Sequence, residues 1–300
     1  MSRVTLTRAL VNLHGAGRAD TYDAALLDVA QDHLLWLLAE LRLFADHDLV
    51  FKGGTSLRKC RLGGTGRFST DLDFACPSED TVLAVCGAID GAAVSGFQFA
   101  LESTSEDGRH WTLVVSHPDL GRPNIPASVE FARRPLVLAP EVLPFLVLPV
   151  HKGYEVPLPT LPVIAEAEAC AEKLARYRRT ALGRDVYDLA KFAGRPIDEP
   201  LVRRLWVLKV WGDVVDDRRG DGPLDPADVL TERRERDFQP ESIGSLTQPV
   251  DLVGWERTVR QRFTFLADLD DDDERRWATC DPRHRREVDD ALAAGGFPPA

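Results

Sequence analysis

The chain has 300 residues, of which 44% are apolar and 28% charged, and its formal net charge is −11. This is the composition of a globular protein with one large domain or two of ordinary size. The negative charge excludes a protein that coats nucleic acid in bulk by neutralising phosphates. Lysine is scarce, because only six of the 37 basic residues are lysines.

The cysteines and the apolar segments indicate the compartment. Five cysteines without a C-x-x-C pair argue against a disulfide framework or a zinc ribbon, so a reducing compartment is expected. The sequence starts without a signal-like segment, and charged residues or prolines interrupt its most apolar stretches, 24–45 and 135–150. We therefore expect a cytoplasmic protein with no membrane contact.

The first predicted element is a helix over 22–46. Its apolar residues recur every three or four positions, and Asp28, Asp32 and Arg42 fall on the polar side. A short apolar run at 49–51 then fits a buried strand. A helix that is followed by several strands is typical of a mixed α/β sheet domain.

A glycine turn and a second strand come next. Gly53 and Gly54 end the first strand, and Thr55 is placed to N-cap a short helix. Residues 71–74 alternate polar and apolar side chains, as a half-buried strand does. Downstream, the patterns predict a helix over 79–93 and strands over 97–102, 111–116 and 127–131.

A proline-rich segment divides the chain. Three prolines within 156–162 remove amide donors, which predicts a linker. Beyond it, 216–252 predicts long loops, and helical spacing covers 163–179, 185–193, 198–215 and 254–268. We expect an α/β (α+β) domain over 1–155, with a mixed sheet flanked by helices, and a mostly helical domain over 163–300.

Two carboxylates on the second strand are the first candidate site. Asp71 and Asp73 are two residues apart on a strand, so they share one face at a spacing of roughly 7 Å, while Leu72 and Phe74 point to the other. Like charges held this close need a counter-cation, which a hard divalent metal ion supplies. Taken alone, a D-x-D pair is more often a solvated acidic edge.

The glycine turn upstream is the second candidate. Glycines let backbone amides approach an anion, a helix N-terminus favours negative charge, and the hydroxyls of Thr55 and Ser56 add donors. Gly53, Gly54, Thr55 and Ser56 thus form a phosphate cradle in physical terms, although the Walker A pattern is absent. On its own, a Gly-Gly-Thr segment is more often a plain turn and cap.

The combination of these segments carries a family resemblance. The segments are KGGTSLR at 52–58, RFSTDLDF at 67–74, EACAEK at 168–173 and RDVYDL at 184–189. In order and spacing they resemble the nucleotidyltransferase superfamily of DNA polymerase β type. More narrowly, they resemble the AbiEii/AbiGii toxins, whose relatives include the MenT toxins. The last third of the chain shows nothing that can be matched.

The resemblance implies a metal centre. Asp71 and Asp73 would hold two Mg²⁺ ions, with Mn²⁺ as the alternative metal. The superfamily usually has a third carboxylate on a neighbouring strand. Glu130 is the best candidate, because it faces opposite to its apolar neighbours on the predicted strand, and Glu102 is its rival.

The helical part adds Lys173, Asp188 and Arg184 to the predicted site. Lys173 would neutralise phosphate charge, Arg184 would bind phosphate, and Asp188 would position or deprotonate the attacking hydroxyl. The arginines near Lys173 suggest a positive patch over 173–184 that suits triphosphate or RNA. The plainer readings are a Glu172–Arg176 pair and an Arg184–Asp188 pair at helical spacing.

The motif residues around the turn complete the nucleotide site. Lys52, Arg67 and Ser69 are expected to bind nucleotide or phosphate together with the turn. Ser69 would share the face of Asp71 if the strand extends backwards. Its plain role is a hydrogen bond to the loop or to a metal-bound water, and a sharper one is to accept a phosphoryl or nucleotidyl group itself.

The resemblance also implies a function. The chain would be the toxin of a toxin–antitoxin pair, transferring NMP from an NTP to an RNA 3′ end, the tRNA acceptor stem first among candidates, with release of pyrophosphate and a block of translation. A winged-helix AbiEi-like antitoxin would be its partner, and it would act as a monomer. The alternatives are a nucleotidyltransferase acting on a small-molecule hydroxyl or a protein side chain, and a non-catalytic scaffold.

Overall fold

A computed structural model of the chain describes residues 5–121, 124–239, 243–269 and 271–295. It divides the chain into two compact units, and each is built from separate stretches. The unit that contains the β-sheet, here called the sheet unit, comprises Met1–Pro135, Pro140–Val163 and Gly244–Pro249. The other, here called the helical unit, comprises Leu136–Ala139, Ile164–Ile243 and Val250–Ala300.

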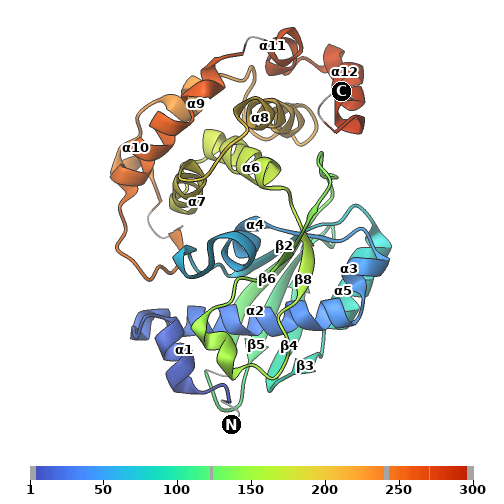
Figure 1. Ribbon diagram of the computed structural model, residues 1–300. Coiled ribbons are helices and arrows are strands. Elements are labelled where there is room, and N and C mark those ends of the chain that lie inside the picture. Colours follow the sequence, from blue (N-terminus) through green and yellow to red (C-terminus); the bar gives the residue numbers. More distant parts are fainter. Residues whose placement is uncertain (1–4, 122–123, 240–242, 270, 296–300) are drawn as a thin grey trace. The chain divides into compact units, whose positions relative to one another are not determined.

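One mixed sheet is the centre of the sheet unit (Figure 1). Its strand order is β3-β4-β5-β6-β2-β1-β8-β7. Strand β2 runs parallel to β6 and antiparallel to β1, and β1 runs parallel to β8, so the predicted mixed sheet is confirmed. The strands are β1 (Val50–Lys52), β2 (Asp71–Ala75), β3 (Ala93–Val94), β4 (Phe97–Thr104), β5 (His110–Ser116), β6 (Ile125–Ala132), β7 (Glu141–Pro144) and β8 (Thr160–Val163).

The helix that packs along the sheet differs from its prediction. Helix α2 (Tyr22–Glu40) contacts β3, β6 and helix α5 (Glu79–Ile89), and Figure 1 shows it running across the strands. The predicted single helix is interrupted at Arg42, whose φ is +60°, and the chain continues as α3 (Leu43–Asp46). The expected polar side of α2 is wrong, because Asp28 and Asp32 are only 2% and 3% exposed.

The remaining elements of the sheet unit are short. Helix α1 (Arg8–His14) precedes α2. Helix α4 (Gly53–Leu57) follows β1 directly and continues as a π-helical turn over Arg58–Leu62. The prediction that Thr55 is the N-cap is wrong, because the helix begins at Gly53 and its N-cap is Lys52.

The proline-rich segment is part of the sheet. The prediction of a linker over 156–162 is wrong at its end, since Thr160–Val163 form β8 between β1 and β7. Strand β1 pairs with β8 at Phe51 and Val163, which leaves Pro162 outside that pairing. A missing amide donor is tolerated at such a position.

Helices build the other unit, as predicted. Helix α6 packs against α7 and α8, α7 against α10, and α8 against α11. The region 216–252 is largely loop, as expected, and its residues 240–242 lie outside the described part. Among the described residues, no helix is long and apolar enough to cross a bilayer. The helices are α6 (Glu166–Arg179), α7 (Gly183–Ala193), α8 (Glu199–Val215), α9 (Ala227–Leu230), α10 (Leu252–Arg262), α11 (Asp272–Ala278) and α12 (Arg285–Ala293).

Candidate functional site

One face of β2 and β6 carries the predicted carboxylates. Asp71 is opposite Ser128 and Asp73 is opposite Glu130 in the parallel register. The residues between them face the core and are fully or almost fully buried; they are Leu72, Phe74, Val129 and Phe131. Alternation along two neighbouring strands therefore places two aspartates, a serine and a glutamate on the same face.

The register separates the two candidates for a third carboxylate. Glu130 lies on β6, next to β2, whereas Glu102 lies on β4 with β5 and β6 between it and β2. A side chain on β4 cannot share an ion with Asp73 across two intervening strands, since neighbouring strands are about 4.8 Å apart. The Oε1 atom of Glu130 is 3.2 Å from Nδ1 of His110 on β5. The geometry thus favours Glu130.

Hydroxyl groups orient Asp71. Ser128 Oγ and Thr70 Oγ1 donate to Oδ1 of Asp71 at 2.9 and 2.8 Å. Thr55 Oγ1 donates to the backbone oxygen of the same residue at 2.5 Å. These bonds fix both the carboxylate and the start of β2 against helix α4.

The glycine turn packs directly on Asp73. Gly53 has φ +75°, and a Cβ atom there would lie 1.8 Å from Oδ2 of Asp73. At Gly54 a Cβ atom would lie 2.3 Å from Nη2 of Arg67 and 3.2 Å from Oγ of Ser69. Only glycine allows this close approach. The structure therefore brings the turn, Asp73, Arg67 and Ser69 together.

The hydroxyls of Thr55 and Ser56, which were predicted to bind phosphate, donate to backbone oxygens instead. Thr55 and Ser56 are fully buried. Thr55 donates to Asp71 O, and Ser56 Oγ donates to Gly53 O at 2.9 Å. In this structure the two hydroxyls support the turn, so the expected donation of these hydroxyls to phosphate finds no support. The first-turn backbone amides remain as donors in this segment, because they have no partner within the helix.

The donor chemistry at β2 fits a divalent cation. Carboxylate oxygens are the ligands that Mg²⁺ prefers, and Asp71 and Asp73 present them on one face. Among the described residues, no three acidic, histidine or cysteine side chains are grouped closely enough to form a complete metal site. Two protein carboxylates are sufficient for Mg²⁺, which usually takes its other ligands from water and substrate phosphates.

The predicted residues of the helical unit form a buried ion-pair cluster. Lys173 is 7% exposed, and its Nζ lies 2.7 Å from Oδ2 of Asp188 and 3.4 Å from Oδ1 of Asp185. Arg176 also pairs with Asp185. Burial would raise the pKa of Asp185, but Lys173 and Arg176 outweigh it and hold that pKa below its usual value.

The arginines around Lys173 are neutralised within their own unit. Arg178 Nε is 2.8 Å from Asp228 Oδ2, and Arg179 Nε is 3.0 Å from Asp213 Oδ2. Lys173, Arg176, Arg178 and Arg179 are each paired with an acid, which reduces the surplus of positive charge expected over 173–184. Arg184 is in the first turn of α7 and half-buried.

Residues of this cluster also pair between helices. Glu172 lies 3.2 Å from Lys209 on α8. Asp188 pairs with Lys173 from the neighbouring helix. Helix spacing alone could not show this, because α6, α7 and α8 supply the partners across their interfaces.

The roles of four residues near the site were missed in the sequence. Ser128 is two positions before Glu130 on one strand, so alternation could have placed it on the site face. Gln31 Nε2 donates to Ser69 O at 3.1 Å, across 38 positions of the chain. Arg58, the last residue of the KGGTSLR motif, and Lys59 are almost fully buried. The scarcity of lysine was the only signal for Lys59.

A mixed sheet whose inner strand presents two aspartates beside a glycine turn is the arrangement that the resemblance to nucleotidyltransferases predicts. A family model described as nucleotidyl transferase AbiEii toxin of a type IV toxin–antitoxin system matches residues 36–294. The chain belongs to this family of nucleotidyltransferase toxins, which confirms the resemblance and the enzyme class predicted from the motifs.

Solved structures include a near relative. MenT4, a nucleotidyltransferase toxin from Mycobacterium tuberculosis, is 68% identical, with a TM-score of 0.93; the match covers 96% of this chain and 99% of that one. JHP933 from Helicobacter pylori is 17% identical, with a TM-score of 0.43 and coverage of 80% and 92%. Among curated proteins, none matches.

Proposed function

We propose that the chain transfers NMP from an NTP to an RNA 3′ end, the tRNA acceptor stem, and so blocks translation. The observation that carries the proposal is the glycine turn held against Asp73, on the strand that also presents Asp71. This arrangement places amide donors for phosphates directly beside carboxylates for a metal ion.

Each group of residues has a part in the proposed transfer. The acceptor hydroxyl oxygen attacks the α-phosphorus, and the bond to the β-phosphate oxygen breaks to release pyrophosphate. The amides of Gly53 and Gly54 bind the leaving phosphates, with Arg67 beside them. Phosphoryl transfer asks the protein mainly for positioning and charge stabilisation.

Asp71 and Asp73 would hold Mg²⁺, or Mn²⁺ in its place, with Glu130 as a further carboxylate on the same face. Two such ions, when bound, neutralise charge on the attacking and leaving oxygens. Ser128 and Thr70 keep the carboxylate of Asp71 oriented for this. The second Mg²⁺ ion is part of the proposal.

Lys173 and Asp188 enter the proposal through the family motifs. Their ion pair gives each a fixed position in the helical unit. Lys173 would neutralise phosphate charge, with Arg184 as a further phosphate contact, and Asp188 would orient the acceptor hydroxyl and take its proton. Lys52, which is opposite Asp73 in the sheet, would flank the phosphates.

The biological setting follows from the family. A type IV toxin has an antitoxin, and we propose a winged-helix AbiEi-like protein in that role. The enzyme would act in the cytoplasm as a monomer, because NTP and tRNA are found there and both predicted carboxylate and phosphate sites belong to one chain.

The test is transfer of label. Purified chain, Mg²⁺ and total RNA are incubated with each α-labelled NTP in turn. We expect label in a tRNA-sized band with one or more of the four nucleotides, and its loss in Asp71→Ala and in Glu130→Ala. Glu102→Ala is the matched control and keeps wild-type transfer, since β4 is remote from β2 in the sheet.

Three results would each contradict a part of the proposal. Absence of label with all four nucleotides would contradict nucleotidyl transfer to RNA. Label in a small molecule or in a protein, with the RNA unlabelled, would move the acceptor to the alternative class. Equal loss in Glu102→Ala and Glu130→Ala would remove the assignment of the third carboxylate.

A further inference from the structure

The loop at 66–69 connects the π-helical turn to β2, and its side chains alternate between two environments. Arg67 and Ser69 lie at Gly54, on the side of the candidate site. Phe68 points the other way, where the Arg58 guanidinium is 3.9 Å from its ring centroid and His14 makes an edge contact. The position of this loop therefore sets the position of two predicted nucleotide contacts.

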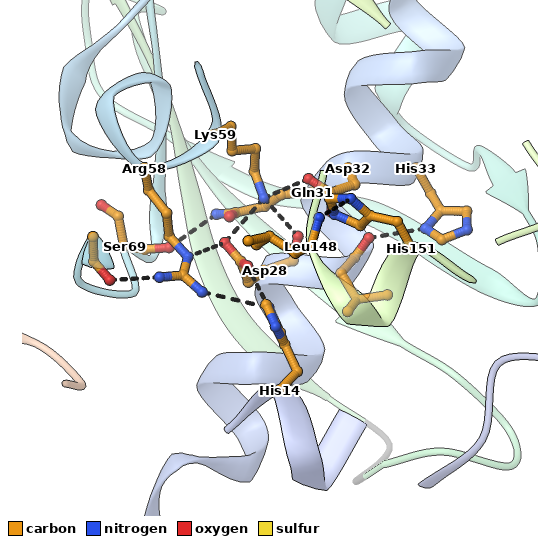
Figure 2. Close-up of polar contacts among 12 residues, drawn as sticks. His14, Asp28, Gln31, Asp32, His33, Arg58, Lys59, Ser69, Leu148 and His151 are labelled. Atoms are coloured by element: carbon orange, nitrogen blue, oxygen red, sulfur yellow. Dashed lines mark hydrogen bonds and ion pairs between the residues drawn. The ribbon is translucent and has the colours of Figure 1, made fainter. Parts of the chain in front are cut away.

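Two side chains hold the backbone of this loop at its ends. Arg58 Nη1 donates to Gly66 O at 2.5 Å, and Gln31 Nε2 donates to Ser69 O at 3.1 Å. Figure 2 shows Gln31 reaching Ser69 from helix α2. Between these points, the amide of Phe68 donates to Ser245 O at 2.9 Å.

A buried ionic cluster holds the guanidinium group of Arg58 in place. Asp28 Oδ1 accepts from Arg58 Nε at 3.0 Å and from Lys59 Nζ at 2.9 Å, and Lys59 is 2.6 Å from Asp32 Oδ1 (Figure 2). His14 Nε2 is 2.7 Å from the other oxygen of Asp28. Groups paired on all sides in a close-packed interior have one arrangement, so the loop is held by a rigid support.

The energetics of Gln31 argue against a role in stability alone. The residue is 1% exposed, and its Oε1 atom has no hydrogen-bond partner among the described residues. A buried polar atom without a partner is destabilising. Methionine has a similar shape and would fill the same space without this penalty. The hydrogen bond to Ser69 is what glutamine supplies and methionine does not.

We propose that Gln31 is a positioning residue for the transfer reaction. By holding Ser69 O, and with Arg58 holding Gly66 O, it keeps Arg67 and Ser69 against the glycine turn in the geometry that binds the triphosphate of the NTP. The inference rests on the function proposed above. Gln31 itself acts through the loop and does not touch substrate.

The test compares two buried side chains of helix α2, Gln31 and His33. Each has one polar atom with a hydrogen bond and one without a partner among the described residues. In Gln31→Met the loop loses one anchor. His33→Phe is the matched control. His33 is fully buried, and within the described residues its ring makes one hydrogen bond, to Val29 O at 2.9 Å, and its other ring nitrogen has no partner. The readouts are kcat, KM for each NTP, direct NTP binding by equilibrium dialysis, and Tm.

We expect a split between activity and stability. Gln31→Met lowers kcat/KM on the order of tenfold, chiefly through KM for the NTP, and weakens NTP binding by a similar factor, while its Tm equals or exceeds that of the wild type. His33→Phe keeps kcat/KM and NTP binding within about twofold. Gln31→Leu, which also removes the donor, gives the same pattern and replaces Gln31→Met if that variant does not fold.

Three results with the variants would overturn the inference. The first is wild-type kcat/KM and NTP binding in Gln31→Met. The second is a loss of activity that comes with a matching loss of Tm, and the third is an equal loss in His33→Phe. If the wild type binds NTP but labels no RNA, the acceptor proposal fails, and weaker NTP binding in Gln31→Met still supports the role of Gln31. If the wild type binds no NTP, both proposals fail.

Discussion

Gly53 is the residue on which the candidate site depends most directly. It turns the chain from β1 into α4 with a φ of +75°, and the place of its missing side chain is taken by the carboxylate of Asp73. Two requirements meet at this position, since a left-handed backbone and a close approach both favour glycine. The turn and the carboxylate are therefore held at one fixed separation.

Replacement of Gly53 by alanine tests this. A Cβ atom would collide with Oδ2 of Asp73, and the backbone conformation alone adds roughly 1–2 kcal/mol. We expect Gly53→Ala to lose at least a hundredfold in nucleotidyl transfer. Activity and Tm are measured beside Gly64→Ala, where a Cβ atom would meet only Leu148, at 3.8 Å. Activity of Gly53→Ala near that of this control would refute the steric argument.

Among single residues, the sequence predicted those positions that depend only on spacing within one strand. Asp71 and Asp73 share a face because strands alternate, and that could be read from five residues. The choice of Glu130 over Glu102 needed the strand order, which spacing does not contain. Gln31 and Arg58 could not be predicted as supports of the loop, because their partners are chosen by the packing of α2.

Helix α2 is the element whose burial the sequence pattern predicts incorrectly. Its polar residues fall at regular spacing, which normally indicates a solvated side. Here Asp28 and Asp32 are buried because Arg58 and Lys59, some thirty positions later in the chain, supply their counter-charges. Buried charges are tolerated when they are paired, and pairing between distant segments leaves no periodic signal.

This cluster makes the sheet unit sensitive to acid. Burial would raise the pKa of Asp28, but Arg58 and Lys59 outweigh it and hold that pKa well below the ordinary value. Lys59 and a hydrogen bond from His151 likewise lower the pKa of Asp32 against its burial. A lowered pKa in the folded state adds stability above the unfolded pKa of about 3.9, and this stability is lost as pH falls through the folded pKa.

We therefore expect the free energy of unfolding to fall steeply below about pH 5. Asp32→Asn should have a lower free energy of unfolding near pH 7 and a shallower decline toward acid, because one of the two titrating carboxylates is removed. Urea unfolding followed by circular dichroism between about pH 2 and pH 7 measures both, with exposed Asp119→Asn as the control. A wild-type curve that is parallel to that of Asp32→Asn would disprove the contribution of this carboxylate.

Across the whole molecule, the five cysteines bear out the prediction of no disulfide framework. All five are free and buried. Burial raises the pKa of Cys60 to about 12 and that of Cys86 to about 11. A thiol reacts as its thiolate, so both burial and a raised pKa protect these side chains.

The prediction is that the native chain is inert to thiol reagents. With iodoacetamide at pH 8, intact mass should show no rapid addition to the folded protein and five additions after unfolding in urea. Nucleotidyl transfer should be equal with and without reductant. Fast alkylation of the folded protein would contradict the buried positions of the cysteines.

The composition of the sheet unit has a consequence for how the protein is made. Its last stretch, Gly244–Pro249, follows most of the helical unit in the chain, and Ser245 supplies the acceptor for the amide of Phe68. Synthesis proceeds from the N-terminus, so a nascent chain has its strands long before it has this contact. The loop beside the glycine turn is thus completed late in translation. A product terminated before residue 244 would lack this anchor.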